Sequence, residues 1–327
     1  MSCRTWPPDE PPPPPPPPPK PPPDPGQPPK FFYSISYYGA LTAPNDSVWK
    51  EDFNQLVQRG IRNVRIWVDW PATWAPNGRC IAPDGSLIPD KVQLFQRILT
   101  GAAARGIKVD MTFGGPGSNN DGYEGNRIDS WQRGIRNMAS VFKDWTLFYP
   151  VDVHNEVHAG IGKTGGELTY AHVASATQQA AAIAPGWSLT ASTDGDSGTV
   201  ALDYAQMIAL GAVIHVCAPH YPRDEGWGGK VESRVKNTRA VLYNNFLIIR
   251  PIYLQEENLY LPGYPGAENW SVEQSTAAAT GARRSAAVGY CFHTHAGFDL
   301  NHGTMFEQLS PGELEAINAL PRGGLTP

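Results

Sequence analysis

Short apolar runs alternate with longer amphipathic stretches from Phe31 onward, and this repeat limits the fold more than any other feature of the chain. Eight such runs occur, and their starts lie 25 to 43 residues apart. That spacing is too long for β-hairpins and is typical of strand–helix units joining parallel strands. The predicted strands are Phe31–Tyr38, Val64–Trp70, Ile107–Phe113, Phe148–Val153, Ser188–Ser192, Val213–Ala218, Ile248–Gln255 and Ala286–Phe292.

The stretches between these strands carry apolar residues at helical spacing, together with signals that start and stop helices. Asp46 or Ser47 precedes one predicted helix and Ser271 another, as expected for N-caps. Gly60 and Gly106 follow two helices directly before the next strand, as expected for left-handed C-caps. The clearest predicted helices are Trp49–Arg59, Lys91–Arg105, Trp131–Lys143, Thr169–Ile183, Val231–Asn244 and Val272–Ser285.

Eight strand–helix units within residues 31–327 predict an α/β protein, a single (β/α)8 TIM barrel. Nearly continuous apolar runs such as Val213–Ala218 are typical of parallel strands covered on both faces. The alternative is an open, doubly wound sheet. Such a sheet normally has a glycine-rich turn after its first strand, whereas Tyr37-Tyr38-Gly39-Ala40 stands here.

Residues 1–30 differ sharply from the rest, because they hold 17 of the 33 prolines, including the unbroken run 11–19. Such a segment forms an extended polyproline rod without a packed core. We expect a disordered tether for the barrel; the alternative is a ligand for a proline-recognising domain. No apolar signal segment follows Met1, yet Cys3 before a proline-rich stretch resembles the residue left by lipoprotein processing. We therefore expect an extracellular or cell-surface-tethered protein.

Composition excludes several classes of protein. A hydrophobic content of 41%, with 10 Trp, 13 Tyr and 11 Phe, excludes a wholly disordered chain. No apolar run approaches the ~20 residues of a membrane-spanning helix, and a net charge of −5 argues against nucleic-acid binding. The four Cys form no Cys-x-x-Cys pair, which argues against a zinc knuckle or a thioredoxin-like site. We expect no metal site and no cofactor. Charged residues make up only 17%, which suits a neutral ligand.

Catalytic groups of TIM barrels project from the carboxyl ends of the strands, so the residues that close each apolar run are the candidates. Two of the runs are closed by a carboxylate, Glu156 after the fourth and Glu256 after the seventh. A glutamate at a barrel mouth is poorly hydrated and needs a reason to be there. One protonated and one ionised carboxyl group are what cleavage of a glycosidic bond requires.

Four stretches in the expected order resemble the clan A glycoside hydrolases, and family 5 in particular. They are the segment from Trp49 to Arg65, the run Val151–Glu156, the pair His220-Tyr221, and the run Pro251–Glu256. The resemblance covers roughly residues 31–320. It implies a retaining hydrolase that cleaves a β-linked glycan through a covalent glycosyl-enzyme intermediate, without a cofactor. The partner would be an oligo- or polysaccharide, and we expect a monomer.

The resemblance also implies a role for individual residues. Glu156 would be the general acid/base, Glu256 the nucleophile, and Asn155 a hydrogen-bonding partner of the sugar 2-OH. Arg65 and Tyr221 would lie beside Glu256 and keep it ionised. Glu257 is the alternative nucleophile, but the spacing from Pro251 favours Glu256.

The remaining candidates line the cleft. His220 would face the same cleft, and Trp67 and Trp70 would stack on sugar faces. The chain departs from family 5 at two strand ends: the third run closes at Gly114 without a histidine, and the eighth closes with His293 and His295 in place of a tryptophan platform.

Two other functions stay open. One is a catalytically inactive carbohydrate-binding barrel, and the other is a metal-dependent barrel hydrolase that would use the His293-Thr294-His295 pair. Metal-dependent barrels carry such a pair on the first strand, where this chain has none.

Overall fold

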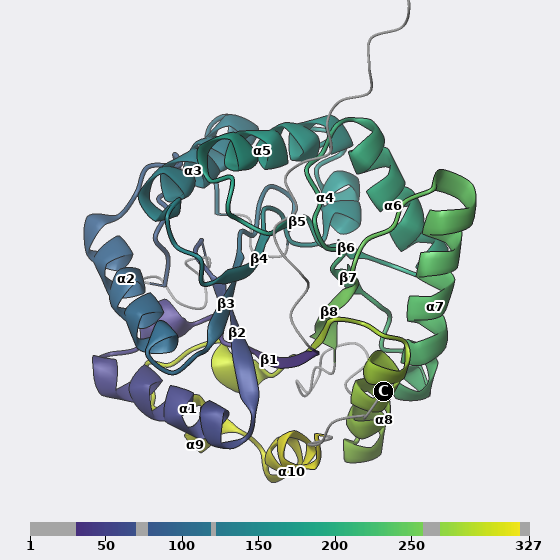
Figure 1. Ribbon diagram of the computed structural model, residues 1–327. Helices are drawn as coiled ribbons and strands as arrows, with labels where there is room; N and C mark the ends of the chain where they lie inside the picture. Colours follow the sequence, from purple (N-terminus) through teal and green to yellow (C-terminus); the bar gives the residue numbers. More distant parts are fainter. Residues whose placement is uncertain (1–30, 70–77, 119–121, 258–268, 321–327) are drawn as a thin grey trace, which may run out of the picture.

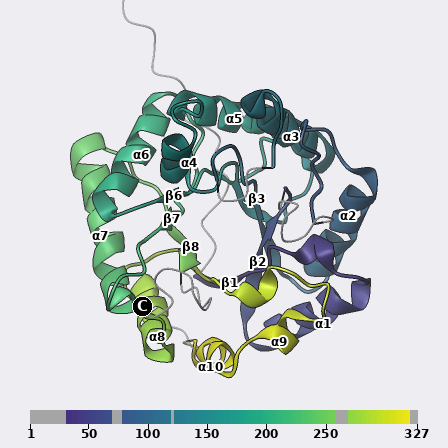
Figure 2. The ribbon, with the colours of Figure 1, turned by 180° about the vertical axis from the view of Figure 1, so that it is seen from behind.

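The computed structural model describes residues 31–69, 78–118, 122–257 and 269–320. Its main element is a parallel sheet with strand order β5-β4-β3-β2-β1-β9-β8. The helices form an outer ring around the strands, as both ribbon views show (Figures 1 and 2). The strands are β1 (Phe32–Ser36), β2 (Ile61–Trp67), β3 (Lys108–Thr112), β4 (Phe148–Asp152), β5 (Leu189–Thr190), β6 (Thr193–Asp194), β7 (Pro219–His220), β8 (Tyr253–Glu257) and β9 (Gly289–Phe292).

The segment from Ile214 to His220 closes the ring between β5 and β8. The His215 amide donates to the carbonyl of Leu189 at 2.9 Å, and the Tyr253 amide donates to the carbonyl of Cys217 at 2.9 Å. Farther along, β6 pairs in parallel with β7. The α/β barrel predicted from the repeat is therefore confirmed, with the sixth segment paired irregularly.

Side chains explain why this part of the ring lacks a regular ladder. The Leu189 amide donates to the His215 ring, and the Ser192 amide donates to the carboxylate of Asp152. The Ala218 amide donates to the Tyr204 hydroxyl. Because these amides bind side chains, the predicted strand Val213–Ala218 appears as one isolated bridge, between Cys217 and Ile252, followed by the short β7.

The helices lie where the sequence predicts amphipathic stretches, with small shifts at their ends. Ser271 caps α8 as predicted, and Gly60 and Gly106 have left-handed φ values of 75° and 65°. The N-cap of α1 is Asn45, one residue before the predicted candidates. The α-helices are α1 (Asp46–Gln58), α2 (Pro89–Ala103), α3 (Arg127–Phe142), α4 (Val157–Lys163), α5 (Tyr170–Ile183), α6 (Ser197–Ala209), α7 (Trp227–Phe246), α8 (Val272–Arg284), α9 (Met305–Gln308) and α10 (Pro311–Ala319).

The apolar core lies between the sheet and the helices, whereas the barrel interior is largely polar. Along β2, Val64 and Ile66 belong to the main hydrophobic cluster. Asn63 and Arg65, which alternate with them, point inward and are 1% and 0% exposed. Strand alternation therefore places a buried arginine at the centre of the barrel.

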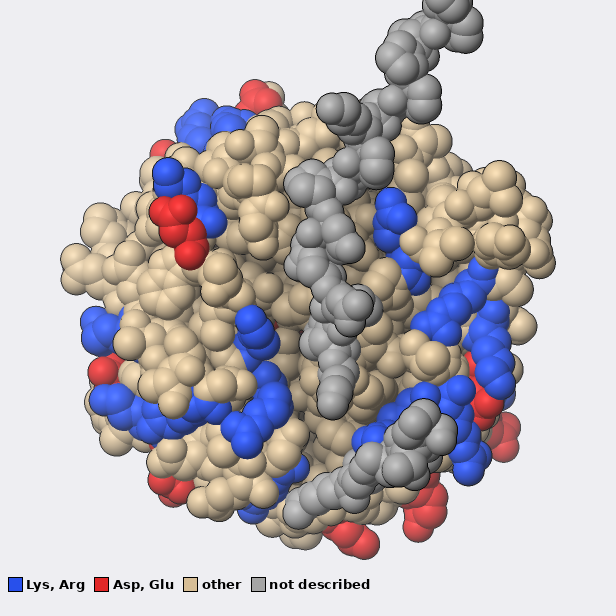
Figure 3. All heavy atoms as spheres, in the orientation of Figure 1, with Lys and Arg blue, Asp and Glu red and all other residues tan. Residues whose placement is uncertain are grey.

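Charged side chains lie on the outer surface of the barrel. Lys and Arg side chains gather in several groups on the face shown in Figure 3, and Asp and Glu lie mainly at its outline. Some arginines bind carbonyl groups where helices end, as Arg105 does with Gly101 and Arg239 with Ser285. In the described part of the chain, no helix has the length and apolar character needed to cross a membrane. The predicted tether, residues 1–30, lies outside the described residues.

Asp52 ties the first helix to the last part of the chain. Its carboxylate accepts hydrogen bonds from the Tyr37 hydroxyl at 2.6 Å and from the amide of Met305 at 2.9 Å. The Phe306 amide adds a third contact at 3.3 Å. Asp52 is fully buried, so removing the carboxylate would leave three donors without their acceptor.

We expect Asp52→Ala to lower the free energy of unfolding by about 2–4 kcal/mol. Glu51→Ala is the matched control, because Glu51 lies on the same helix and is exposed. This control should change stability by no more than about 0.5 kcal/mol. Urea denaturation of both variants checks the prediction, and equal midpoints would show that Asp52 does not tie the chain ends together.

Candidate active site

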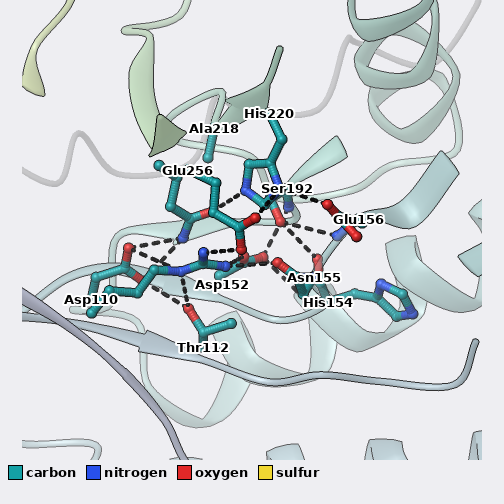
Figure 4. A network of polar contacts seen from close by, with 12 residues as sticks. Asp110, Thr112, Asp152, His154, Asn155, Glu156, Ser192, Ala218, His220 and Glu256 are labelled. Carbon is teal, nitrogen blue, oxygen red and sulfur yellow. Dashed lines mark hydrogen bonds and ion pairs between the residues drawn. The ribbon is translucent and has the colours of Figure 1, made fainter. Parts of the chain in front are cut away.

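The carboxyl ends of four barrel segments bring one polar cluster together. Arg65 comes from β2, Asn155 and Glu156 follow β4, His220 ends β7, and Glu256 lies on β8. Figure 4 shows Glu156, His220 and Glu256 turned toward one another above Asp110 and Asp152. Residues more than 90 positions apart in the sequence thus share one site.

Arg65 is the centre of this cluster. Its Nη1 donates to Glu256 Oε1 at 2.5 Å and to the Tyr38 hydroxyl at 2.5 Å. Its Nη2 donates to Asn155 Oδ1 at 2.7 Å, and its Nε donates to Thr112 Oγ1 at 3.0 Å. The guanidinium therefore holds side chains from four different segments in fixed positions.

Two further carboxylates face the same guanidinium. Asp152 Oδ2 lies 3.5 Å from Arg65 Nη2, and Asp110 Oδ2 lies 3.7 Å from Arg65 Nε. Burial raises the pKa of Asp110 to about 7, with Asp152 adding to the rise and Arg65 opposing it. Burial also raises the pKa of Asp152, again against the effect of Arg65. One arginine thus faces more negative charge than it can neutralise.

Glu256 is the carboxylate that this cluster keeps ionised. The Tyr38 hydroxyl donates to its Oε1 at 2.8 Å, and His220 Nδ1 lies 3.4 Å from its Oε2. Burial alone would raise its pKa, but the positive charges of His220 and Arg65 outweigh that effect and hold the pKa well below its usual value. His293 does not supply a cation, since burial lowers its own pKa to about 3.

A β-bulge aims Glu256 into the barrel mouth. Leu254 pairs with Tyr290 and Glu257 with Phe292, so two residues of β8 oppose the single residue Cys291 of β9. Gln255 and Glu256 therefore both face inward, which strict alternation would not allow. Glu257 is buried elsewhere, with a pKa that burial raises to about 7.

Glu156 is the N-cap residue of α4 and has a left-handed conformation, with φ of 57° and ψ of 63°. Its amide donates to Ser192 Oγ at 3.1 Å, and its Oε1 lies 3.3 Å from His220 Nδ1. This backbone conformation is strained for a residue with a side chain, and such strain gathers at functional sites. The side chain is 17% exposed, against 8% for Glu256.

The predicted contact between Tyr221 and Glu256 is wrong. The Tyr221 hydroxyl instead bonds to Thr238 Oγ1 at 2.7 Å, because its side chain packs against α7. Tyr38 takes the expected place beside Glu256, and sequence reasoning missed it. The only signal was its position as the last residue of the first predicted strand, Phe31–Tyr38.

Of the other predicted cleft residues, the structure places some at the site and others away from it. His293 Nδ1 lies 3.0 Å from the Tyr38 hydroxyl, while His295 is exposed and packs on Phe298. The predicted stacking of Trp67 on a sugar finds no open ring face, because the side chain is 1% exposed and its ring packs on Tyr38. Trp70 lies outside the described residues.

Glu156, His220 and Glu256 are also the group of possible metal ligands found in the described residues. One ligand atom of each lies within 4.8 Å of the other two. The Glu256 oxygen nearest Arg65 already accepts two hydrogen bonds, and the guanidinium would repel a dication. The donor set therefore suits shared protons better than a metal ion.

Solved glycosidases share this fold at low sequence identity. The β-mannanase from the blue mussel Mytilus edulis is 12% identical, with a TM-score of 0.58 over 89% of this chain and 91% of that chain. Endoglucanase Cel5A from Pseudomonas stutzeri is 15% identical, with a TM-score of 0.59 over 90% and 94%. A family 5 mannosidase from Rhizomucor miehei is 13% identical, with a TM-score of 0.56 over 81% of each chain. No family model and no curated protein sequence matches the chain.

The likeness to clan A barrels that the sequence motifs predicted is thus confirmed for the fold. At these identities the comparisons establish the barrel and leave the chemistry to the side chains on it.

We expect Arg65→Met to lower the free energy of unfolding by about 3–5 kcal/mol near neutral pH, since it leaves buried carboxylates uncompensated. Without the guanidinium, the folded-state pKa values of Asp110 and Asp152 rise further above their unfolded values. The contribution of these two carboxyl groups to stability is then fully present below about pH 4, and it is lost as the pH rises toward and beyond 7. Urea denaturation at pH 5 and pH 7 should show a larger loss at pH 7.

Arg62→Met is the matched control, because Arg62 lies on the same strand and is exposed. This variant should stay within about 0.5 kcal/mol of the original protein at both pH values. If Arg65→Met behaved like Arg62→Met, the buried ion network would contribute nothing to stability.

Proposed function

We propose that the protein is a retaining glycoside hydrolase that cleaves the O-glycosidic bond of a β-linked glycan. The observation that carries the proposal is the pairing of two carboxyl groups in different environments. Oxygens of Glu156 and Glu256 approach within 4.8 Å, and only Glu256 is bound by both Arg65 and Tyr38. Two such groups are the equipment for splitting a glycosidic bond.

In the first step, an oxygen of Glu256 attacks the anomeric carbon while Glu156 gives its proton to the leaving oxygen. The bond to the leaving group breaks, and a covalent glycosyl-enzyme forms. In the second step, Glu156 takes a proton from water, whose oxygen displaces Glu256. The anomeric configuration is inverted twice and therefore retained.

The separation of the carboxyl groups favours this mechanism over inversion. Retaining enzymes hold the two groups about 5–5.5 Å apart, whereas inverting enzymes need about 6.5–9.5 Å to admit a water molecule. The oxygen–oxygen approach within 4.8 Å is closer to the retaining separation than to the inverting one.

Positioned groups around the pair support the same reading. Arg65 binds Asn155 through Oδ1, and among the described residues Asn155 Nδ2 has no hydrogen-bonding partner and can face substrate. This orientation suits a hydrogen bond to the sugar 2-OH, which strengthens in the transition state. The fold shared with mannanases and an endoglucanase makes β-linked mannan and glucan the first substrates to test. We also propose that the protein acts at the cell surface or outside the cell.

Glu256→Ala should abolish turnover of an aryl β-glycoside, and azide should restore it with an α-glycosyl azide as the product. Glu156→Ala should spare substrates with activated leaving groups and give a β-glycosyl azide, because only poor leaving groups need the proton. Proton NMR of the products distinguishes the two anomers. A panel of aryl glycosides and of mannan, glucan, xylan and galactan identifies the substrate.

Glu257→Gln is the matched control, since the Glu257 carboxyl group points away from the barrel mouth. It should retain turnover and need no azide. Rescue of Glu257→Ala instead of Glu256→Ala would move the nucleophile by one residue. A sugar-binding protein with no turnover on the whole panel would be an inactive carbohydrate-binding barrel.

Tyr38→Phe should lower kcat/KM by about 10- to 100-fold, because the nucleophile loses a hydrogen bond to a charged group worth about 1.5–3 kcal/mol. Tyr221→Phe should stay within a few-fold of the original protein, since its hydroxyl contacts Thr238. Steady-state kinetics on an activated aryl glycoside check both variants. A larger loss in Tyr221→Phe than in Tyr38→Phe would contradict the assignment of Tyr38.

A further inference from the structure

His220 lies between the two carboxyl groups on one side and an amide on the other. Its Nδ1 is 3.3 Å from Glu156 Oε1 and 3.4 Å from Glu256 Oε2. Its Nε2 is 3.2 Å from Gln255 Oε1. Which ring nitrogen carries the proton therefore decides what His220 offers to the carboxyl pair.

Asp110 determines which end of the Gln255 amide faces the histidine. Gln255 Nε2 donates to Asp110 Oδ2 at 2.9 Å and to Oδ1 at 3.1 Å. In the opposite orientation, the amide oxygen would meet two carboxylate oxygens at those distances, which is repulsive. The Gln255 oxygen must therefore point toward His220.

An amide oxygen can only accept a hydrogen bond, so His220 Nε2 must donate. In the neutral ring this leaves Nδ1 as a lone pair aimed at the carboxyl pair. We propose that Asp110 and Gln255 are positioning residues that hold the His220 proton on Nε2, so that Nδ1 exchanges a proton with Glu156. The proton moves from the Glu156 carboxyl to Nδ1 and back, with no net change.

The charges around His220 agree with this assignment. Burial would lower its pKa, but the carboxylates of Glu256 and Glu156 raise it above its ordinary value. The Gln255 oxygen adds an acceptor for the imidazolium, which acts in the same direction. The other charged or titratable groups that act on His220 are Arg65 from β2, Asp152 from β4, Glu257 from β8 and His293 after β9.

The arrangement has a chemical consequence for the nucleophile. With the proton on Nδ1, a neutral His220 would donate a hydrogen bond to Glu256 and weaken its attack on the sugar. With the proton on Nε2, the ring accepts a hydrogen bond from the protonated Glu156 carboxyl group instead, and the hydrogen bonds to Glu256 come from Arg65 and Tyr38. This consequence rests on the proposed function, whereas the position of the proton does not.

The test is the ring nitrogen signals of His220 in the full-length protein labelled with 15N-histidine, assigned by comparison with His220→Gln. The sample is titrated upward through the His220 transition, and long-range 1H–15N correlations then identify the protonated nitrogen of the neutral ring. We expect protonated Nε2 in the original protein. Protonated Nδ1 there would overturn the proposal outright.

Variants separate the two positioning residues. Gln255→Met removes the acceptor, so the neutral ring should turn to protonated Nδ1 and the transition should fall by about one pH unit. Gln255→Glu keeps an oxygen facing Nε2 and should restore protonated Nε2. Asp110→Asn frees the amide to turn and should give a mixture of both tautomers. Unchanged signals in Gln255→Met would refute the role of Gln255, and unchanged signals in Asp110→Asn would refute that of Asp110.

Kinetics connect the inference to the reaction. With an active aryl glycoside, the basic limb of kcat/KM should shift to lower pH in Gln255→Met and return in Gln255→Glu. An unshifted limb alongside the expected NMR change would show that the locked proton has no part in turnover. If no glycoside is cleaved at all, the proposed function fails while the NMR result still decides where the proton lies.

Discussion

One buried guanidinium organises the centre of this barrel. Arg65 has no exposed surface, and its charge faces the carboxylates of Asp110, Asp152 and Glu256. Removing charges from water is costly, and a single cation cannot neutralise three anions. The imbalance falls on Asp110 and Asp152, whose pKa values rise, while the charges of His220 and Arg65 keep Glu256 ionised. A structural ion network and a candidate nucleophile are thus parts of one electrostatic balance.

The backbone departs from regular geometry at the places where this balance needs side chains to point inward. The bulge in β8 turns both Gln255 and Glu256 into the barrel, so that one reaches Asp110 and the other reaches Arg65. The left-handed backbone of Glu156 bends the chain from β4 into α4 and leaves its carboxyl beside His220. Each irregularity interrupts the regular backbone locally, and each brings side chains from distant segments together.

The site also differs from the pattern its motifs resemble. The phenol beside Glu256 comes from Tyr38, two residues after β1, rather than from Tyr221 after β7. His293, which follows β9, packs against the same phenol and stays neutral. The end of β9 therefore contributes a polar contact in place of an aromatic platform. After β3, Gly115 has φ of 74°, and a Cβ there would lie 2.3 Å from the His154 ring. A larger residue could not stand at that position without moving His154.

Much of the fold and part of the site could be predicted from the sequence, because both follow from local order along the chain. Apolar runs at strand–helix spacing predicted the α/β barrel, and strand ends predicted that Glu156 and Glu256 would lie at its mouth. The resemblance to clan A glycoside hydrolases added Arg65, Asn155 and His220 to that site. A periodic sequence pattern does not predict where the structure departs from that period. The bulge that separates Glu256 from Glu257, the exchange of Tyr221 for Tyr38, and the chain from Asp110 through Gln255 to His220 depend on contacts between segments up to 218 residues apart. Those contacts are decided by packing and by buried charge, which exist only once the ring is closed.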